Sequence, residues 1–301
     1  MARRRAEGRG PGGAPPAAHG QLSPGEAVPA PEVSLLVLGS ASGVPTGDRF
    51  CTSFALRGPD GLLLLDCGAP ASTLLYRYGE DPAQLQAILL THFHVDHTAD
   101  LPVLVQQLWL LNARRSTPLR VPVYGPPGTE ARLEWLKRFH LMRLPGLYPP
   151  AELDPVAARD AAAGTRYPLG PSSEVEFFAT THFPPPWDRP EFREANFGQP
   201  LVPYGMVVRA AGRTIVYSGD SRRADEVAPY LAGCTVLVHE LGHHEPAQVC
   251  RLAAAHRVPH LLLTHLHPRY DQADAELAAA AAAAGYAGAL SIARDGLRLA
   301  L

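Results

Sequence analysis

The chain has 301 residues, of which 46% are hydrophobic and 19% charged, so it can bury one large core or two small ones. Its 27 Lys and Arg residues and 29 Asp and Glu residues give a formal net charge of -2. The protein as a whole therefore does not attract polyanions, and any nucleic acid would have to bind to a local positive patch. Four cysteines without a CxxC pair exclude a disulfide scaffold, and no apolar stretch approaches the about 20 residues of a membrane helix. We therefore expect a cytoplasmic protein with reduced thiols.

Residues 1–32 are rich in Ala, Gly and Pro and contain almost no large apolar side chains. Such a segment cannot bury enough surface to offset the entropy lost on ordering. It is predicted to be a disordered tail, and residues 33–301 are predicted to form one domain. A transit peptide is disfavoured because Ser is scarce and amphipathic periodicity is absent.

The predicted elements change character along the domain. The first part contains hairpins and buried strands with intervening helices: strands 34–38, 52–56 and 62–65, helix 71–78, strand 87–90, helix 101–111, strand 121–124 and helix 130–139. The middle is predicted as irregular chain over 141–172, a strand at 174–179, a loop over 183–204 with six prolines, and a hairpin of 205–208 and 214–218. The last third alternates helix 223–231, strand 235–238, helix 246–256, strand 261–263, helix 273–284 and short strands to Leu301. This order favours an α/β fold, a four-layer αββα sandwich with helices outside two sheets.

The segment Thr91-His92-Phe93-His94-Val95-Asp96-His97 follows a predicted buried strand. In extended backbone His92, His94 and Asp96 lie on one face, and His97 joins them where the chain turns into a helix. A bound divalent cation removes the repulsion among such side chains, and nitrogen and oxygen donors of this kind suit zinc. A merely His-rich polar loop is disfavoured because burial penalises unpaired charge. The segment predicts a metal site.

His92-x-His94-x-Asp96-His97 resembles the signature of the metallo-β-lactamase fold hydrolases, and the other motifs of that family follow in order. Asp66, before Cys67-Gly68, resembles the family's buried structural aspartate. The resemblance implies two divalent metal ions, Zn²⁺ first with Mn²⁺ or Fe²⁺ as alternatives. Their implied ligands are His92, His94, Asp96, His97, His182, Asp220 and His265.

Within the family the chain resembles the ribonuclease Z branch, through Leu38-Gly39-Ser40, Gly43-Val44-Pro45 and Leu263–Tyr270. The pair His239-Glu240 implies a general acid, His239, oriented by Glu240, and with Asp96 these are the predicted catalytic residues. The long tRNA-binding arm of that branch is missing, because only 38 positions separate His182 from Asp220. The continuation after Glu240 also departs from the branch, reading Leu241-Gly242-His243-His244.

These observations predict a dinuclear metal-dependent hydrolase, a phosphodiesterase related to ribonuclease Z, with a metal-bridging hydroxide as nucleophile. The alternative is hydrolysis of a carbonyl or sulfate ester (lactone, thioester, β-lactam or arylsulfate) on the same site, and a remote alternative is a non-hydrolytic metal-binding protein. The expected substrate is a small ester or phosphodiester. RNA is disfavoured because the segment between His182 and Asp220 is short and because the chain has a net charge of -2. A homodimer is an open alternative.

Three further groups of side chains have open roles. His243 and His244 are expected to line the pocket or face solvent, and Arg269 is a candidate anion contact. Phe183, Trp187 and Phe192 either wall a substrate pocket or anchor their loop.

Overall fold

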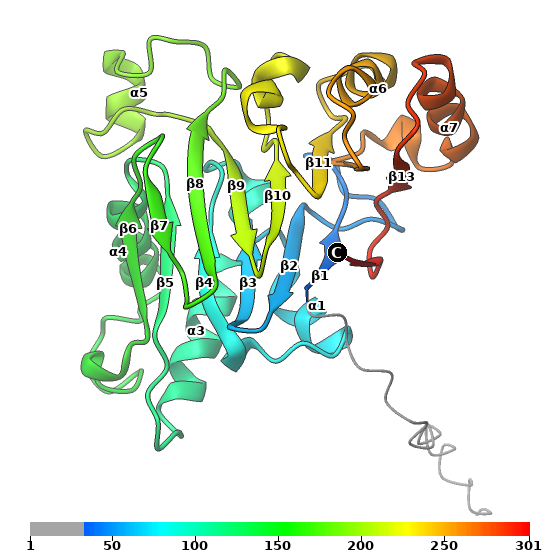
Figure 1. Cartoon of the computed structure of the whole chain (residues 1–301). Coiled ribbons are helices and arrows are strands. Elements are labelled where there is room, and N and C mark those ends of the chain that lie inside the picture. The colour runs from blue at the N-terminus through cyan, green and yellow to red at the C-terminus, as the bar shows by residue number, and fades with distance from the viewer. Residues whose placement is uncertain (1–32) are drawn as a thin grey trace, which may run out of the picture. The chain divides into compact units, whose positions relative to one another are not determined.

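Two seven-stranded sheets lie face to face in the computed structural model, which describes residues 33–301 (Figure 1). The predicted tail, 1–32, lies outside the described residues. The first sheet has the order β14-β1-β2-β3-β4-β5-β6. Its strands are β1 (Ser34–Gly39), β2 (Ser53–Gly58), β3 (Gly61–Leu65), β4 (Leu85–Leu89), β5 (Val121–Gly125), β6 (Val156–Asp160) and β14 (Arg298–Ala300). The hairpin strands pair antiparallel, and β3 to β6 run parallel.

The second sheet has the order β13-β12-β11-β10-β9-β8-β7. Its strands are β7 (Arg166–Pro168), β8 (Ser173–Ala179), β9 (Tyr204–Ala210), β10 (Arg213–Tyr217), β11 (Val236–Glu240), β12 (His260–Thr264) and β13 (Ala289–Ile292). Strands β7 to β10 pair antiparallel, and β10 to β13 run parallel. Each sheet therefore has an antiparallel part and a parallel part, and the parallel parts carry the connecting helices.

Helices cover the outer faces of both sheets. The α-helices are α1 (Ala71–Arg77), α2 (Val95–Thr98), α3 (Leu101–Asn112), α4 (Thr129–Phe139), α5 (Pro190–Ala195), α6 (Pro246–Ala255) and α7 (Asp274–Ala283). Short 3₁₀ helices are η1 (Pro82–Gln84), η2 (Ala151–Leu153), η3 (Ala224–Tyr230) and η4 (Pro268–Tyr270). Helices α1, α3 and α4 pack on the first sheet, and η3, α6 and α7 pack on the second. This is the predicted αββα order of layers. No helix within 33–301 combines the length and the apolar character needed to span a membrane.

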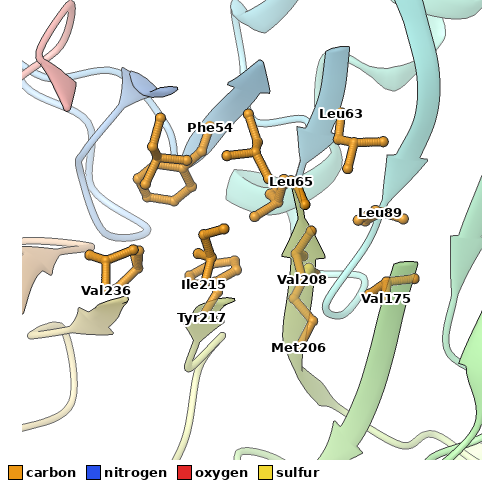
Figure 2. Close-up of a cluster of buried hydrophobic side chains, with 14 of the residues drawn as sticks. Phe54, Leu63, Leu65, Leu89, Val175, Met206, Val208, Ile215, Tyr217 and Val236 are labelled. Atoms are coloured by element: carbon orange, nitrogen blue, oxygen red, sulfur yellow. The ribbon is translucent and has the colours of Figure 1, made fainter. Parts of the chain in front are cut away.

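The core between the sheets follows from strand alternation. In β1, Leu35 and Val37 point toward the second sheet, whereas Leu36 and Leu38 point toward the helices. Figure 2 shows side chains of the two sheets meeting in this core, where the rings of Phe54 and Tyr217 pack edge to face with centroids 5.3 Å apart. Burying each aliphatic side chain contributes roughly 2 kcal/mol, so this core holds the two sheets together.

Three predicted segments differ from the structure. The segment 141–172, predicted to be irregular, contains β6 and β7, which are edge strands whose mostly uncovered side chains show no apolar alternation. The predicted loop 183–204 contains α5, which begins at a proline that presets the helical φ angle and which buries none of its residues. The helix predicted near 223–231 is the 3₁₀ helix η3, with Pro229 inside it.

Candidate metal centre

The candidate site lies where strands from both sheets end. His92 follows β4 of the first sheet, and Asp220 and His265 follow β10 and β12 of the second. His182 follows β8, and Glu240 is the last residue of β11. The carboxyl ends of these strands meet at one edge of the sandwich, so residues far apart in the chain converge there, as ligand sites do at strand ends of open α/β sheets.

One half of the site, called here the imidazole half, consists of His92, His94 and His182 with Asp220. One donor atom from each of the four lies within 4.8 Å of the others. His182 Nε2 is 3.1 Å from His94 Nδ1, and His92 Nε2 is 3.7 Å from Asp220 Oδ2. Burial lowers the pKa of His92 well below its ordinary value and that of His182 to about 4. These rings are neutral at pH 7 and keep lone pairs for a cation.

The other half, called here the carboxylate-rich half, consists of Asp96, His97 and His265, again beside Asp220. His265 Nε2 is 3.1 Å from Asp96 Oδ2, and His97 Nε2 is 3.4 Å from Asp220 Oδ1. The two imidazoles approach each other with Nε2 atoms 3.4 Å apart. Asp220 therefore faces both halves, and all seven predicted ligand residues converge.

Asp66 orients His97 from behind. Its Oδ2 lies 2.8 Å from His97 Nδ1 and accepts a hydrogen bond from the Tyr217 hydroxyl, and its Oδ1 accepts one from the Thr91 backbone N–H. Burial alone would lower the pKa of His97, but the negative charges of Asp220 and Asp66 outweigh it and raise the pKa well above its ordinary value. The hydrogen bond fixes Nδ1 as the donor and turns Nε2 toward the centre.

Backbone strain accompanies this arrangement. Asp66 and His265 both adopt positive φ angles, 56° and 50°, which non-glycine residues take up at a cost of about 1–3 kcal/mol. Gly242 packs directly on the His265 ring, because a Cβ atom at that position would lie 2.5 Å from His265 Nδ1. The surrounding structure thus forces two side chains of the centre into place rather than leaving them to adjust.

His239 does not face the centre, which contradicts its predicted role as general acid. The ring is fully buried, with Nδ1 2.9 Å from the carbonyl oxygen of Glu240 and Nε2 3.1 Å from that of Ala224. His239 and Glu240 are adjacent on β11, and adjacent strand residues point to opposite faces. The two side chains therefore do not meet at one site, which follows from their being neighbours within a strand.

Glu240 instead orients His243, which the sequence interpretation left as pocket-lining or solvent-facing. The buried carboxylate contacts His243 Nδ1 at 3.0 Å and accepts a hydrogen bond from the His243 backbone N–H. It also lies 3.3 Å from His244 Nε2 and 3.6 Å from His265 Nδ1. The hydrogen bond to Glu240, above all, raises the pKa of His243. Its ring, 40% exposed, lies 4.9 Å from that of His182 at the mouth of the centre.

The aromatic side chains of the 183–203 segment divide into two roles. The Phe183 ring packs against His92 and His94, with centroid distances of 5.8 and 5.1 Å, and so walls the imidazole half. Trp187 donates its indole N–H to the carbonyl of Phe183, and Phe192 lies under the Arg189 guanidinium. Phe183 lines the site, whereas the other two rings anchor the loop.

The donor set fits divalent cations. His92 Nε2 and Asp220 Oδ1 are buried, and neither has a hydrogen-bond partner within 33–301. Such orphaned polar atoms cost about 1–3 kcal/mol each unless something satisfies them. The nitrogen and carboxylate oxygen donors converge in three overlapping groups: His92, His94, His182 and Asp220; Asp220, Glu240, His243 and His265; and Asp96, His97 and His265. Donors of these kinds suit zinc and its borderline neighbours. The residues present therefore match the metal ions that the sequence implied.

The four-layer fold and the donor cluster at its strand ends define the class of protein. Residues 63–287 match the family model described as "Beta-lactamase superfamily domain", and the chain belongs to this family. More particularly, it is 28% identical over 287 residues to a Ribonuclease Z of Methanothermobacter thermautotrophicus, with 81% of this chain and 89% of the relative covered. The predicted family and fold are confirmed.

Two solved structures share the fold. The metallo-β-lactamase fold protein YhfI of Bacillus subtilis superposes with a TM-score of 0.67 at 22% identity, covering 89% of this chain and 98% of that one. The short form of human tRNase Z superposes with a TM-score of 0.60 at 20% identity, covering 88% and 98%. At these identities the likeness establishes the architecture, and the chemistry must be argued from the residues of the site.

Proposed function

We propose that this protein is a dinuclear, divalent-metal-dependent phosphodiesterase. The observation that carries the proposal is the convergence of the seven predicted ligand side chains in a chain similar to Ribonuclease Z. That similarity supports a phosphodiester substrate, with RNA as a candidate. The alternative, a carbonyl or sulfate ester, uses the same donors and differs only in the bond presented to them.

Each residue has an assigned task in this proposal. The imidazole half would hold one cation and the carboxylate-rich half a second. When bound, divalent cations supply Lewis acidity toward the phosphoryl oxygens and acidify the attacking water. We assign Zn²⁺ first, with Mn²⁺ and Fe²⁺ as alternatives. Asp66 and Glu240 hold the ligand rings in register, and Phe183 excludes water from one side.

His243 takes the proton-donor role that the sequence interpretation gave to His239. Its Nδ1 is bound to Glu240, and within residues 33–301 its Nε2 makes no hydrogen bond. The contact with Glu240 favours the protonated ring, so Nε2 can give its proton to a departing oxygen. The partly exposed position of the His243 ring, 4.9 Å from that of His182, supports this role.

A substrate panel tests the proposal. We expect the protein reconstituted with Zn²⁺ or Mn²⁺ to bind two equivalents of metal and to hydrolyse bis(p-nitrophenyl) phosphate faster than a lactone or a thioester. Chelation should abolish that turnover, and added metal should restore it. Less than one equivalent per chain after reconstitution, or faster turnover of a carbonyl substrate, would contradict the assignment.

A further inference from the structure

Next to the metal centre lies a cleft lined by arginines, called here the arginine cleft. Its volume is about 400 Å³, and it opens between the start of η3 and the outer face of α6. Figure 1 shows the coil of η3 beside α6, over the end of the second sheet. The charged and polar side chains that line it are Arg222, Arg223, Asp225, His244, Gln248 and Arg251.

The positive charge of this cleft is largely uncompensated. Of its three arginines, only Arg223 pairs with a carboxylate, that of Asp225 at 3.0 Å. Within the described residues, Arg222 and Arg251 form no salt bridge, and both side chains are exposed. Arg269, the anion contact suggested by the sequence, differs because it pairs with Glu245 at 2.9 Å. In a chain with a net charge of -2, the cleft is a local patch that can hold a polyanion.

Residues of the arginine cleft contact residues of the metal centre. Arg222 is two residues after Asp220, and its Nε lies 3.4 Å from the carbonyl oxygen of His182. His244, in the wall of the cleft, contacts both Ser221 Oγ and Glu240 Oε1. One wall of the cleft is therefore built by residues adjacent to the proposed ligands. This proximity supports a substrate that reaches both places, with its reacting group at the centre and a second group in the cleft.

Resting on the proposed phosphodiesterase function, we propose that the arginine cleft binds a second phosphate group of the substrate, distinct from the one that is cleaved. Guanidinium groups suit this ligand because they stay charged and match phosphate oxygens with two parallel donors. The chemistry belongs to an RNA strand, which carries a phosphate at each nucleotide, or to a small nucleotide diphosphate ester. In either case the substrate carries more than one phosphate.

The test compares binding and turnover in the full chain. The double variant Arg222→Gln with Arg251→Gln removes the two unpaired charges, and Arg213→Gln removes an exposed charge at the opposite end of β10 as a matched control. We expect the double variant to bind a fluorescein-labelled single-stranded oligoribonucleotide about ten-fold more weakly and to lower the slope of log affinity against log salt by about one. The control should bind like the wild type.

Turnover separates the cleft from the centre. The double variant should lose about ten-fold more activity on the oligoribonucleotide than on bis(p-nitrophenyl) phosphate, because the latter has no second phosphate. Arg251→Gln alone should also lower activity more on the oligoribonucleotide than on bis(p-nitrophenyl) phosphate. Unlike Arg222, Arg251 makes no hydrogen bond to the proposed ligand His182 in the described part of the chain. A parallel assay with a dinucleoside pyrophosphate identifies the source: a larger loss there than on RNA assigns the cleft to a small diphosphate ester.

The outcomes distinguish two kinds of failure. If bis(p-nitrophenyl) phosphate is cleaved but the variants and the control bind and cleave both multi-phosphate ligands alike, the cleft proposal is wrong and the phosphodiesterase stands. If no phosphodiester is cleaved but binding still falls in the double variant, the cleft binds phosphate and the proposed function is wrong.

Discussion

The two halves of the metal centre solve the problem of burying charge in opposite ways. In the imidazole half, burial lowers the pKa values of His92, His94 and His182, so the rings are neutral, and Asp220 is the only carboxylate among its donors. In the carboxylate-rich half, four buried carboxylates surround two rings: Asp66, Asp96, Asp220 and Glu240. There burial is outweighed by the charges of Asp220, Asp96 and Glu240, which raise the pKa of His265 to about 10.

The comparison shows that one half supplies neutral nitrogen donors, whereas the other half supplies negatively charged oxygen donors. The imidazole half offers lone pairs without changing its own charge. The carboxylate-rich half has excess negative charge that needs positive charge nearby, because unpaired buried charge is costly. Asp220 is a donor of the imidazole half and also lies 3.4 Å from His97 Nε2 and 3.5 Å from His265 Nε2, so the two halves are coupled through one side chain.

Removing the shared carboxylate should have the largest effect. Asp220→Asn is expected to lower turnover by at least about 1000-fold, more than the about 10–100-fold that losing a group behind a metal ligand costs. Both halves should lose affinity for metal, which elemental analysis after gel filtration measures. A variant that kept two equivalents of metal would show that the halves are not coupled through Asp220.

Removing the proposed proton donor should have the second largest effect on turnover. His243→Asn is expected to slow cleavage of a substrate with an alkoxide leaving group about 100-fold, within the usual contribution of a general acid. It should slow p-nitrophenyl release much less, because that leaving group needs no proton. His239→Asn is the matched control, since its ring faces backbone carbonyls. Equal losses in the two variants on both substrates would remove His243 from the proton-donor role.

The carboxylate-rich half can be weakened alone. Asp66→Asn removes the charge behind His97 and is expected to weaken metal binding by about 10–100-fold. Only one of the two bound metal ions should lose affinity, so a metal titration followed by calorimetry should resolve one tight site and one weakened site. Two equally weakened sites would contradict the division into halves.

Glu80 provides a buried carboxylate outside the centre and sharpens the comparison. It is 3% exposed and pairs with Arg57 and, at 2.7 Å, with Arg298. Glu80→Gln should leave metal content unchanged and lower the free energy of unfolding at pH 7 by about 1–2 kcal/mol, since both arginines reach solvent.

The pH dependence of that loss has a definite sign. Burial alone would raise the pKa of Glu80, but its hydrogen bonds to Arg57 and Arg298 lower it below 4.5 in the folded protein. The stabilisation is present above the unfolded-state pKa and disappears as the pH falls through the lower, folded-state pKa. The stability difference between wild type and Glu80→Gln, measured by urea unfolding, should therefore be full at pH 7 and shrink in acid below about pH 4.5. If the difference in unfolding free energy persisted at low pH, it would come from packing and not from the ion pairs of Glu80.

The sequence by itself determined the layers of the fold and the identity of the converging side chains. Strands such as Leu62–Leu65 are continuous apolar runs, which suit strands covered on both faces, and the His92-x-His94-x-Asp96-His97 motif identified its donors. The predicted single extended face was wrong, because Asp96 lies in α2 and joins His97 and His265, apart from His92 and His94. Edge strands β6 and β7 escaped prediction, because one exposed side removes the apolar pattern that marks a strand.

Only the tertiary structure decided which histidine Glu240 contacts and that Arg222 and Arg251 line one cleft. His239 and His243 lie in one short segment, and the direction of each ring depends on the face of β11 and on the turn that follows it. Arg222 and Arg251 are 29 positions apart and meet only because η3 and α6 pack on the same sheet face. Local pattern specifies which side of an element a residue occupies, whereas neighbours across the fold depend on how separate elements pack together.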